Sequence, residues 1–155
     1  MAWSEWKKFS GDVHFFDKIF PDYTIDTFLP SSYLDIPSKI SKTSDYWKSY
    51  MKWGESTLSL CHVNNCINYD EIDSIEIEYV RSTDNPDSPN TFYCLDANGS
   101  TLTSISLNSY TRTTAIINTS SFSGIGKFKL TQLVGGSKGS GYSSEIIIYN
   151  IELKP

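Results

Sequence analysis

The feature that most constrains the fold is a two-residue alternation of apolar and polar side chains in the second half of the chain. Ile75, Ile77 and Tyr79 alternate with glutamates, and Phe128 and Leu130 alternate with lysines. Successive side chains of a β-strand point to opposite faces of its sheet, whereas a helical pattern repeats about every 3.6 residues. The alternation therefore predicts strands with one buried face and one solvated face, as in packed antiparallel sheets.

Turn residues divide the rest of this region into further strands. Asn98-Gly99 lies between the strand-like segments Thr91–Leu95 and Thr101–Leu107, which predicts a hairpin because both turn residues tolerate positive φ. The other predicted strands are Trp47–Trp53, Thr57–Val63, Thr113–Asn118 and Ser144–Lys154. In the last of these, the expected faces are Ile147, Tyr149, Ile151 and Leu153 on one side and Ile146, Ile148, Asn150 and Glu152 on the other.

About eight to ten short strands and no long helix predict an all-β fold, a two-sheet antiparallel β-sandwich of jelly-roll type. The length of 155 residues suits one domain. We expect a single β-sandwich domain over residues 1–155, in which residues 1–45 are irregular with short strands and residues 46–155 supply the main strands. Pro21, Pro30 and Pro37 all fall in the irregular part, where proline interrupts regular pairing.

The charge of the chain narrows the classes of partner. The net charge is −5 and the pI is near 4.9, so the surface repels phosphate backbones and no nucleic-acid partner is expected. No apolar run approaches the roughly 20 residues that span a bilayer, so no membrane insertion is expected. Three cysteines cannot all pair within one chain, which favours folding in a reducing compartment.

Catalytic residue types are scarce. The only histidines are His14 and His62, whereas a serine or cysteine nucleophile needs a histidine base. Cys61 precedes His62 on a predicted strand, so the two side chains would point to opposite faces. The cluster of Cys61, His62 and Cys66 is interpreted as a buried cysteine and a strand-end histidine rather than a zinc site. We therefore expect a protein that is not an enzyme, and we assign no catalytic residue.

Carboxylates suggest two further kinds of chemistry. Glycoside hydrolysis needs a facing pair about 5–10 Å apart, but Glu76 and Glu78 alternate with apolar residues and are interpreted as a solvated strand face. A glycan-degrading enzyme is therefore the least favoured alternative. No cofactor is assigned, although a structural calcium ion stays an open alternative because aspartates recur in the first third of the chain. These are Asp12, Asp17, Asp22, Asp26 and Asp35.

Aromatic residues make up 14% of the chain, and their positions suggest two uses. Those in apolar alternation are expected in the core, namely Phe15, Phe16, Tyr79, Phe92, Phe128 and Tyr149. A second group, Tyr46, Trp47, Tyr50 and Trp53, brings four large rings into eight residues. Because neighbouring residues of a strand alternate between faces, these rings cannot all reach the core.

Exposed rings are suited to sugars, because the C–H face of a pyranose stacks on them while polar groups meet its hydroxyls. Loops at one end of a sandwich often carry such residues. We predict a ligand-binding site made of aromatic residues and polar loop residues. Its members are Trp47, Tyr50, Trp53, Asn64, Tyr110, Arg112 and Tyr142.

Two-thirds of the chain, from about His62 to Leu153, resembles carbohydrate-binding-module-like domains in tail, baseplate and fibre proteins of phages that infect Gram-positive bacteria. The segments that carry the resemblance are Val63–Asn65, Ile72–Tyr79, Phe92, Leu95-Asp96, Ser104–Ser106, Thr114–Asn118, Phe122–Gly124, Gly126–Leu130 and Ile146–Leu153. These segments correspond to successive strands, so the resemblance transfers no individual binding residue.

The resemblance implies a jelly-roll module that binds a host cell-surface polysaccharide. It also implies a place in the virion, in the tail or baseplate, after synthesis in the bacterial cytoplasm, with other virion proteins as possible partners. The alternative is a structural or protein-docking domain of a virion protein, because sandwich folds serve many roles. A docking domain would expose a flat apolar patch, whereas a saccharide site would expose rings among polar groups.

Overall fold

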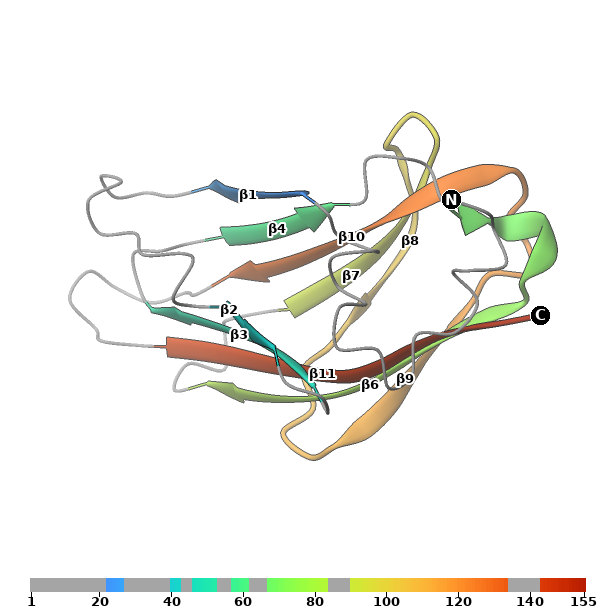
Figure 1. Cartoon of the computed structure of the whole chain (residues 1–155). Coiled ribbons are helices and arrows are strands. Elements are labelled where there is room, and N and C mark those ends of the chain that lie inside the picture. The colour runs from blue at the N-terminus through green and yellow to red at the C-terminus, as the bar shows by residue number, and fades with distance from the viewer. Residues whose placement is uncertain are drawn as a thin grey trace.

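The computed structural model describes residues 22–26, 40–42, 46–52, 57–61, 67–83, 90–133 and 143–155. Strands in these ranges form two antiparallel sheets that face each other (Figure 1). The first, the β10 sheet, has the order β1 (Asp22–Asp26), β4 (Thr57–Cys61), β10 (Ile125–Leu133), β7 (Asn90–Asp96) and β8 (Thr101–Ser106), with β5 (Ile67–Asn68) also paired to β10. The second, the β11 sheet, has the order β2 (Ile40–Lys42), β3 (Trp47–Lys52), β11 (Ser143–Lys154), β6 (Ser74–Thr83) and β9 (Thr113–Asn118). The predicted all-β, two-sheet antiparallel sandwich is confirmed.

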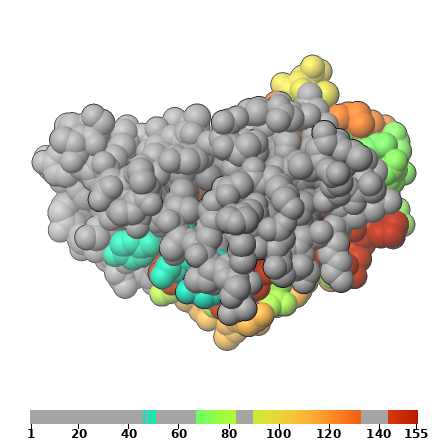
Figure 2. All heavy atoms as spheres, in the orientation of Figure 1, coloured from blue at the N-terminus to red at the C-terminus, as the bar shows by residue number. Residues whose placement is uncertain are grey.

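The described residues form eleven strands, slightly more than the eight to ten expected, and one short 3-10 helix, η4 (Tyr69–Glu71). The Asn98-Gly99 turn joins β7 to β8 as predicted, and Gly99 has φ of 86°, the conformation that favours glycine. The Asp96 carboxylate accepts hydrogen bonds from the backbone N–H groups of Asn98 and Ser100, both at 2.9 Å. This turn projects from the molecular surface and is yellow in Figure 2.

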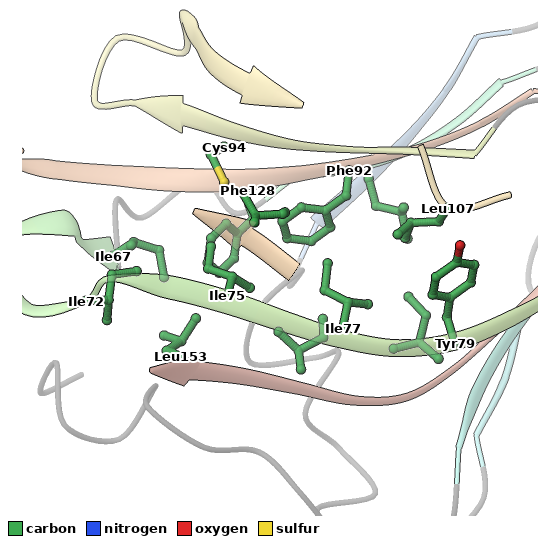
Figure 3. Close-up of a cluster of buried hydrophobic side chains, with 14 of the residues drawn as sticks. Ile67, Ile72, Ile75, Ile77, Tyr79, Phe92, Cys94, Leu107, Phe128 and Leu153 are labelled. Atoms are coloured by element: carbon green, nitrogen blue, oxygen red, sulfur yellow. The ribbon is translucent and has the colours of Figure 1, made fainter. Parts of the chain in front are cut away.

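The hydrophobic core lies between the sheets (Figure 3). Ile75 and Ile77 of β6 point toward Phe92 and Phe128 of the opposite sheet, and Tyr79 points toward Leu107. The five predicted core residues among these, Ile75, Ile77, Tyr79, Phe92 and Phe128, are buried. The rings of Phe92 and Phe128 lie 5.2 Å apart between centroids. Burying one such side chain contributes about 1.5–3 kcal/mol, so this facing set stabilises the contact between the layers. Two further expected core residues, Phe15 and Phe16, lie outside the described residues.

A β-bulge in β11 overturns the expected faces of that strand. Ile146 and Ile148 are buried, and beyond the bulge Ile151 and Leu153 are buried as well. The pairing register with β6 shifts between Ile148 and Asn150, so Tyr149 is an extra residue that has no partner of its own. One inserted residue exchanges the two faces of everything that follows. The prediction of one continuous alternation was therefore wrong.

The same bulge corrects the assignment of Tyr149 to the core. Its side chain is only partly buried, because the bulge leaves it outside the inward-facing rows on either side. The Arg112 guanidinium carbon lies 3.7 Å from its ring centroid.

One end of the sandwich interior is polar instead of hydrophobic. The Ser49 hydroxyl donates to Gln132 Oε1 at 2.6 Å, and Gln132 Nε2 donates to the Ser144 carbonyl at 3.0 Å. Ser49 and Ser144 belong to the β11 sheet and Gln132 to the β10 sheet, so these hydrogen bonds connect the two layers. All three side chains are buried, and the hydrogen bonds of Ser49 and Gln132 satisfy polar groups that water does not reach, whereas the buried Ser144 hydroxyl has no hydrogen-bond partner among the described residues.

Candidate functional site

The structure describes four of the seven predicted binding residues. Trp47 opens β3, where its backbone pairs with Ile148, while its side chain lies outside the described atoms. Tyr50, Tyr110 and Arg112 are described with their side chains. The other three, Trp53, Asn64 and Tyr142, lie outside the described residues, as do His62 and Cys66.

Tyr110 and Arg112 lie in the connection from β8 to β9, where the chain crosses from one sheet to the other. Tyr110 accepts a hydrogen bond from Arg81 Nη2 at 3.1 Å, and its ring centroid lies 5.0 Å from the Arg81 guanidinium carbon. Arg81 is buried on the inward face of β6, where Asn108 Oδ1 accepts from its Nη1 at 2.5 Å. Tyr110 therefore helps to satisfy a buried charge, although it remains 56% exposed.

Arg112 turns to the opposite side of β6. Its Nε donates to Glu78 Oε1 at 2.7 Å, and its Nη2 contacts the same oxygen. Glu78 belongs to the outward row of β6, between the buried Ile77 and Tyr79. The structure therefore separates Tyr110 from Arg112, which sequence proximity had placed in one site.

Arg112 also covers an aromatic ring. Its guanidinium carbon lies 3.7 Å from the centroid of Tyr149, a cation–π distance. The Tyr149 ring meets Tyr46 edge to face, with centroids 6.2 Å apart and an interplanar angle of 74°. The bulge in β11 makes this cluster possible, because it places Tyr149 beside Glu78 on the outer side of the sheet.

A shallow, open hollow of about 310 Å³ lies beside this cluster and is lined by Glu78, Arg112, Thr113 and Thr114. Glu78 and Thr114 are direct partners across the β6–β9 pair, and Thr113 pairs with Tyr79. The lining offers a carboxylate, a guanidinium and two exposed threonine hydroxyls. Such a set can accept and donate several hydrogen bonds at once, as a polyhydroxylated ligand requires.

Tyr50 faces the same side of the β11 sheet but lies away from the hollow. Its partner on β11 is Glu145, and Glu145 pairs in turn with Ser82 on β6. Ser82 is four residues from Glu78, a distance of about 13 Å along a strand. Tyr50 is partly buried there, so the structure does not bring it into the cluster around Arg112.

Sequence reasoning missed most of the residues that line the hollow. Glu78 was interpreted only as part of a solvated face, which is correct, since its side chain is 33% exposed and ion-paired. Thr113 and Thr114 were expected only as strand residues. Their closeness to Glu78 follows from the β6–β9 register, and no local pattern in the sequence reports which strands pair.

The hollow has little capacity for catalysis. Glu78 is the one carboxylate among its lining residues, whereas glycoside hydrolysis uses two.

The buried Cys94, which does not line the hollow, is no candidate nucleophile. Burial raises the pKa of the Cys94 thiol to about 12, and a hydrogen bond with Tyr69 lowers it by less. A thiol with this pKa stays protonated at neutral pH and is a poor nucleophile.

The described residues contain no group of three or more His, Cys, Asp and Glu side chains that could hold a metal ion. The expected calcium ligands cannot be placed, because the side chains of Asp22 and Asp26 are not described and Asp12, Asp17 and Asp35 lie outside the described residues. Within the same part of the chain, no helix has the length and apolar character needed to cross a membrane.

No protein-family model matches the chain, and no curated protein matches it. A solved structure described as "CBM4 structure and function" is similar over 90% of this chain and 99% of its own, with 11% sequence identity and a TM-score of 0.46. Another, "Carbohydrate-Binding Module CBM36 in complex with calcium and xylotriose", is similar over 70% of this chain and 79% of its own, with 13% identity and a TM-score of 0.34. These two structural neighbours are carbohydrate-binding modules.

Proposed function

We propose that this protein is a non-catalytic carbohydrate-binding module whose ligand contacts the hollow on the outer face of the β11 sheet. The observation that carries the proposal is the convergence of Glu78, Arg112, Thr113 and Thr114 beside the Tyr149 ring. Sugars present many hydroxyls that donate and accept, and an open hollow admits an internal segment of a chain as well as its end. A preformed ion pair also holds both charged groups in place before the ligand arrives, which reduces the entropic cost of binding.

The biological setting that we propose is a phage adhesion device, with the module in the tail or baseplate of a virion. The resemblance of the strand segments to modules of phages that infect Gram-positive bacteria supports this setting. The ligand would then be a cell-wall polysaccharide of the host. A single shallow site gives weak affinity, but display in several copies can raise the apparent affinity by about 10²–10⁴ through effective concentration.

A protein-docking role has less support among the described residues. The large hydrophobic side chains that are exposed there are Tyr110, Ile116 and Ile125. They belong to three different elements, the β8–β9 connection, β9 and β10, and the two strands lie in different sheets. Single exposed hydrophobic residues are ordinary on protein surfaces and do not form a docking patch.

The proposal is tested by isothermal titration of the protein with purified cell-wall polysaccharides from a panel of Gram-positive bacteria. We expect saturable binding to at least one polymer. Arg112→Ala should weaken that binding roughly tenfold or more, because it removes charge-assisted hydrogen bonds worth about 1.5–3 kcal/mol.

The matched control is Lys48→Ala. Lys48 is a cation on the same outer face, paired with Glu145 at 3.8 Å and outside the lining of the hollow, so its loss should change the affinity less than about twofold. Thermal unfolding of both variants checks that they fold. If no wall polysaccharide binds the wild-type protein, even when several copies are displayed on one scaffold, the proposed function is wrong.

A further inference from the structure

Among the described side chains on the outer face of the β11 sheet, the ion pairs contain more carboxylates than cations. Among its described side chains, each cation has a carboxylate within 4 Å. Lys48 pairs with Glu145 at 3.8 Å, Arg112 pairs with Glu78, and Lys154 lies 3.8 Å from Glu76 and 3.5 Å from Glu152. Three cations thus face four carboxylates, which leaves this described set with a net charge of −1.

Of these ion pairs, the Arg112–Glu78 pair is the one that lines the hollow, so a ligand there contacts it directly. Both contacts of Arg112 go to Oε1 of Glu78. Oε2 of Glu78 has no hydrogen bond within the described residues, so it can accept from ligand hydroxyls. Arg112 is 59% exposed and keeps further N–H donors for hydroxyl, ring or amide oxygens of a sugar.

The Arg112–Glu78 pair disfavours an anionic ligand. A phosphate or carboxylate that approaches Arg112 must compete with Glu78, which already neutralises the guanidinium. The same anion is repelled by Glu78 and by the whole chain, whose net charge is −5. Hydroxyl groups pay no such cost, because they can use the carboxylate and the guanidinium together.

We infer that the hollow selects uncharged saccharide chains, built from neutral hexoses or N-acetylhexosamines, over phosphate-bearing or uronate-bearing polymers. This inference rests on the proposed function, because it names the class of ligand for the same site. It assigns Glu78 two tasks: it accepts ligand hydroxyls, and it cancels the attraction of Arg112 for anions. Glu78 is thus a specificity-determining residue as well as a binding residue.

The experiment compares the neutral polysaccharide fraction and the teichoic acid fraction from walls of the same Gram-positive strains, by titration between 50 and 500 mM NaCl. We expect the neutral polymer to bind roughly fivefold or more tightly than the polyol-phosphate polymer. Its affinity should change less than about twofold with salt, since no net charge is neutralised on binding. Tighter binding of the teichoic acid, weakening steeply with salt, would overturn the inference while leaving saccharide binding itself in place.

The variant Glu78→Gln separates the role of charge from the role of shape. Glutamine is close in size to glutamate but leaves the Arg112 charge uncompensated. We expect weaker binding of the neutral polymer and a salt-dependent gain in binding of the teichoic acid. Glu145→Gln removes a carboxylate from the same face outside the hollow and should leave both affinities within about twofold.

Each outcome of this comparison decides one point. An equal gain in teichoic acid binding by both variants would mean that the overall charge of the protein, rather than Glu78, sets the selectivity, and the inference would be wrong. No change of selectivity in Glu78→Gln would also contradict it. Absence of binding to either wall fraction would refute the proposed function, and the inference would fall with it.

Discussion

Single residues at the candidate site have roles that depend on their partners more than on their type. Tyr110 and Arg112 are two positions apart, yet Tyr110 accepts a hydrogen bond from the buried Arg81, whereas Arg112 pairs with Glu78 on the outer face. The sequence identifies both as polar or aromatic residues of one loop. It cannot show their separation, because that depends on the side of β6 that each side chain reaches.

Gly126 allows the close approach of β10 to η4 and β7. A Cβ atom at this position would collide with the Leu95 carbonyl oxygen and with the ring of Tyr69. Gly126→Ala is therefore expected to lower the free energy of unfolding by about 2–3 kcal/mol, the cost of overpacking a filled interior. Urea denaturation measures this loss.

Gly124→Ala is the control for this prediction. Gly124 has φ of 78° and nothing within 4 Å of an added Cβ, so its replacement adds only backbone strain of about 1–2 kcal/mol. If Gly126→Ala unfolds at the same urea concentration as the wild type, the close contact with Leu95 and Tyr69 does not exist in solution.

At the scale of elements, local alternation predicts where strands lie but not how they continue. The segment Thr113–Asn118 was predicted and forms β9 with the same bounds. The run of isoleucines in β11 gave no sign of a bulge, because apolar residues on both sides of the insertion hide the change of face. The position of Tyr149 was consequently predicted wrongly, and so was its role.

The bulge in β11 is expected to be essential for stability, because it keeps the apolar side chains on both sides of Tyr149 in the core. Deletion of Tyr149 would restore a continuous register and turn either Ile146 and Ile148 or Ile151 and Leu153 toward solvent. Exposure of two such side chains costs about 3–6 kcal/mol, so the deletion variant should unfold at much lower urea concentration. Tyr149→Ala, which keeps the register, should lose only about 1 kcal/mol. Similar stability of the two variants would mean that the strand tolerates a shift of register.

For the whole molecule, the sequence predicts the class of fold because the alternation, the turn residues and the chain length can all be read without knowing which strands pair. The order of strands in each sheet was not predictable. Glu78 and Thr114 lie 36 positions apart in the chain and become neighbours only through the β6–β9 register. The hollow is a product of this pairing, which explains why a correct fold class led to an incomplete site.

The buried Cys94 makes the stability of the whole molecule sensitive to alkaline pH. Burial raises the pKa of its thiol to about 12, while an unfolded chain has a cysteine pKa near 8.5. Above pH 8.5 the unfolded state loses a proton that the folded state retains, so the free energy of unfolding falls as pH rises toward 12. The decrease from this thiol is expected to be roughly 1 kcal/mol per pH unit.

Urea titrations of the wild type and of Cys94→Ala at pH 7 to 10 measure this effect. The variant lacks this thiol but keeps Cys61 and Cys66, so the two slopes of stability against pH should differ by the contribution of Cys94. Parallel slopes would show that the Cys94 thiolate is tolerated in the folded protein. Below pH 8 no difference in slope is expected.

The central position of β11 has a mechanical consequence. This strand is bonded to β6 on one side through Ser144–Lys154 and to β3 on the other through Ser143–Ile148. Ladder hydrogen bonds run across the strand direction, so tension along β11 loads the bonds of both neighbours in shear at the same time. An edge strand pulled in the same direction is held by the bonds of one neighbour, whereas β11 can be extracted only when the bonds to both neighbours break together.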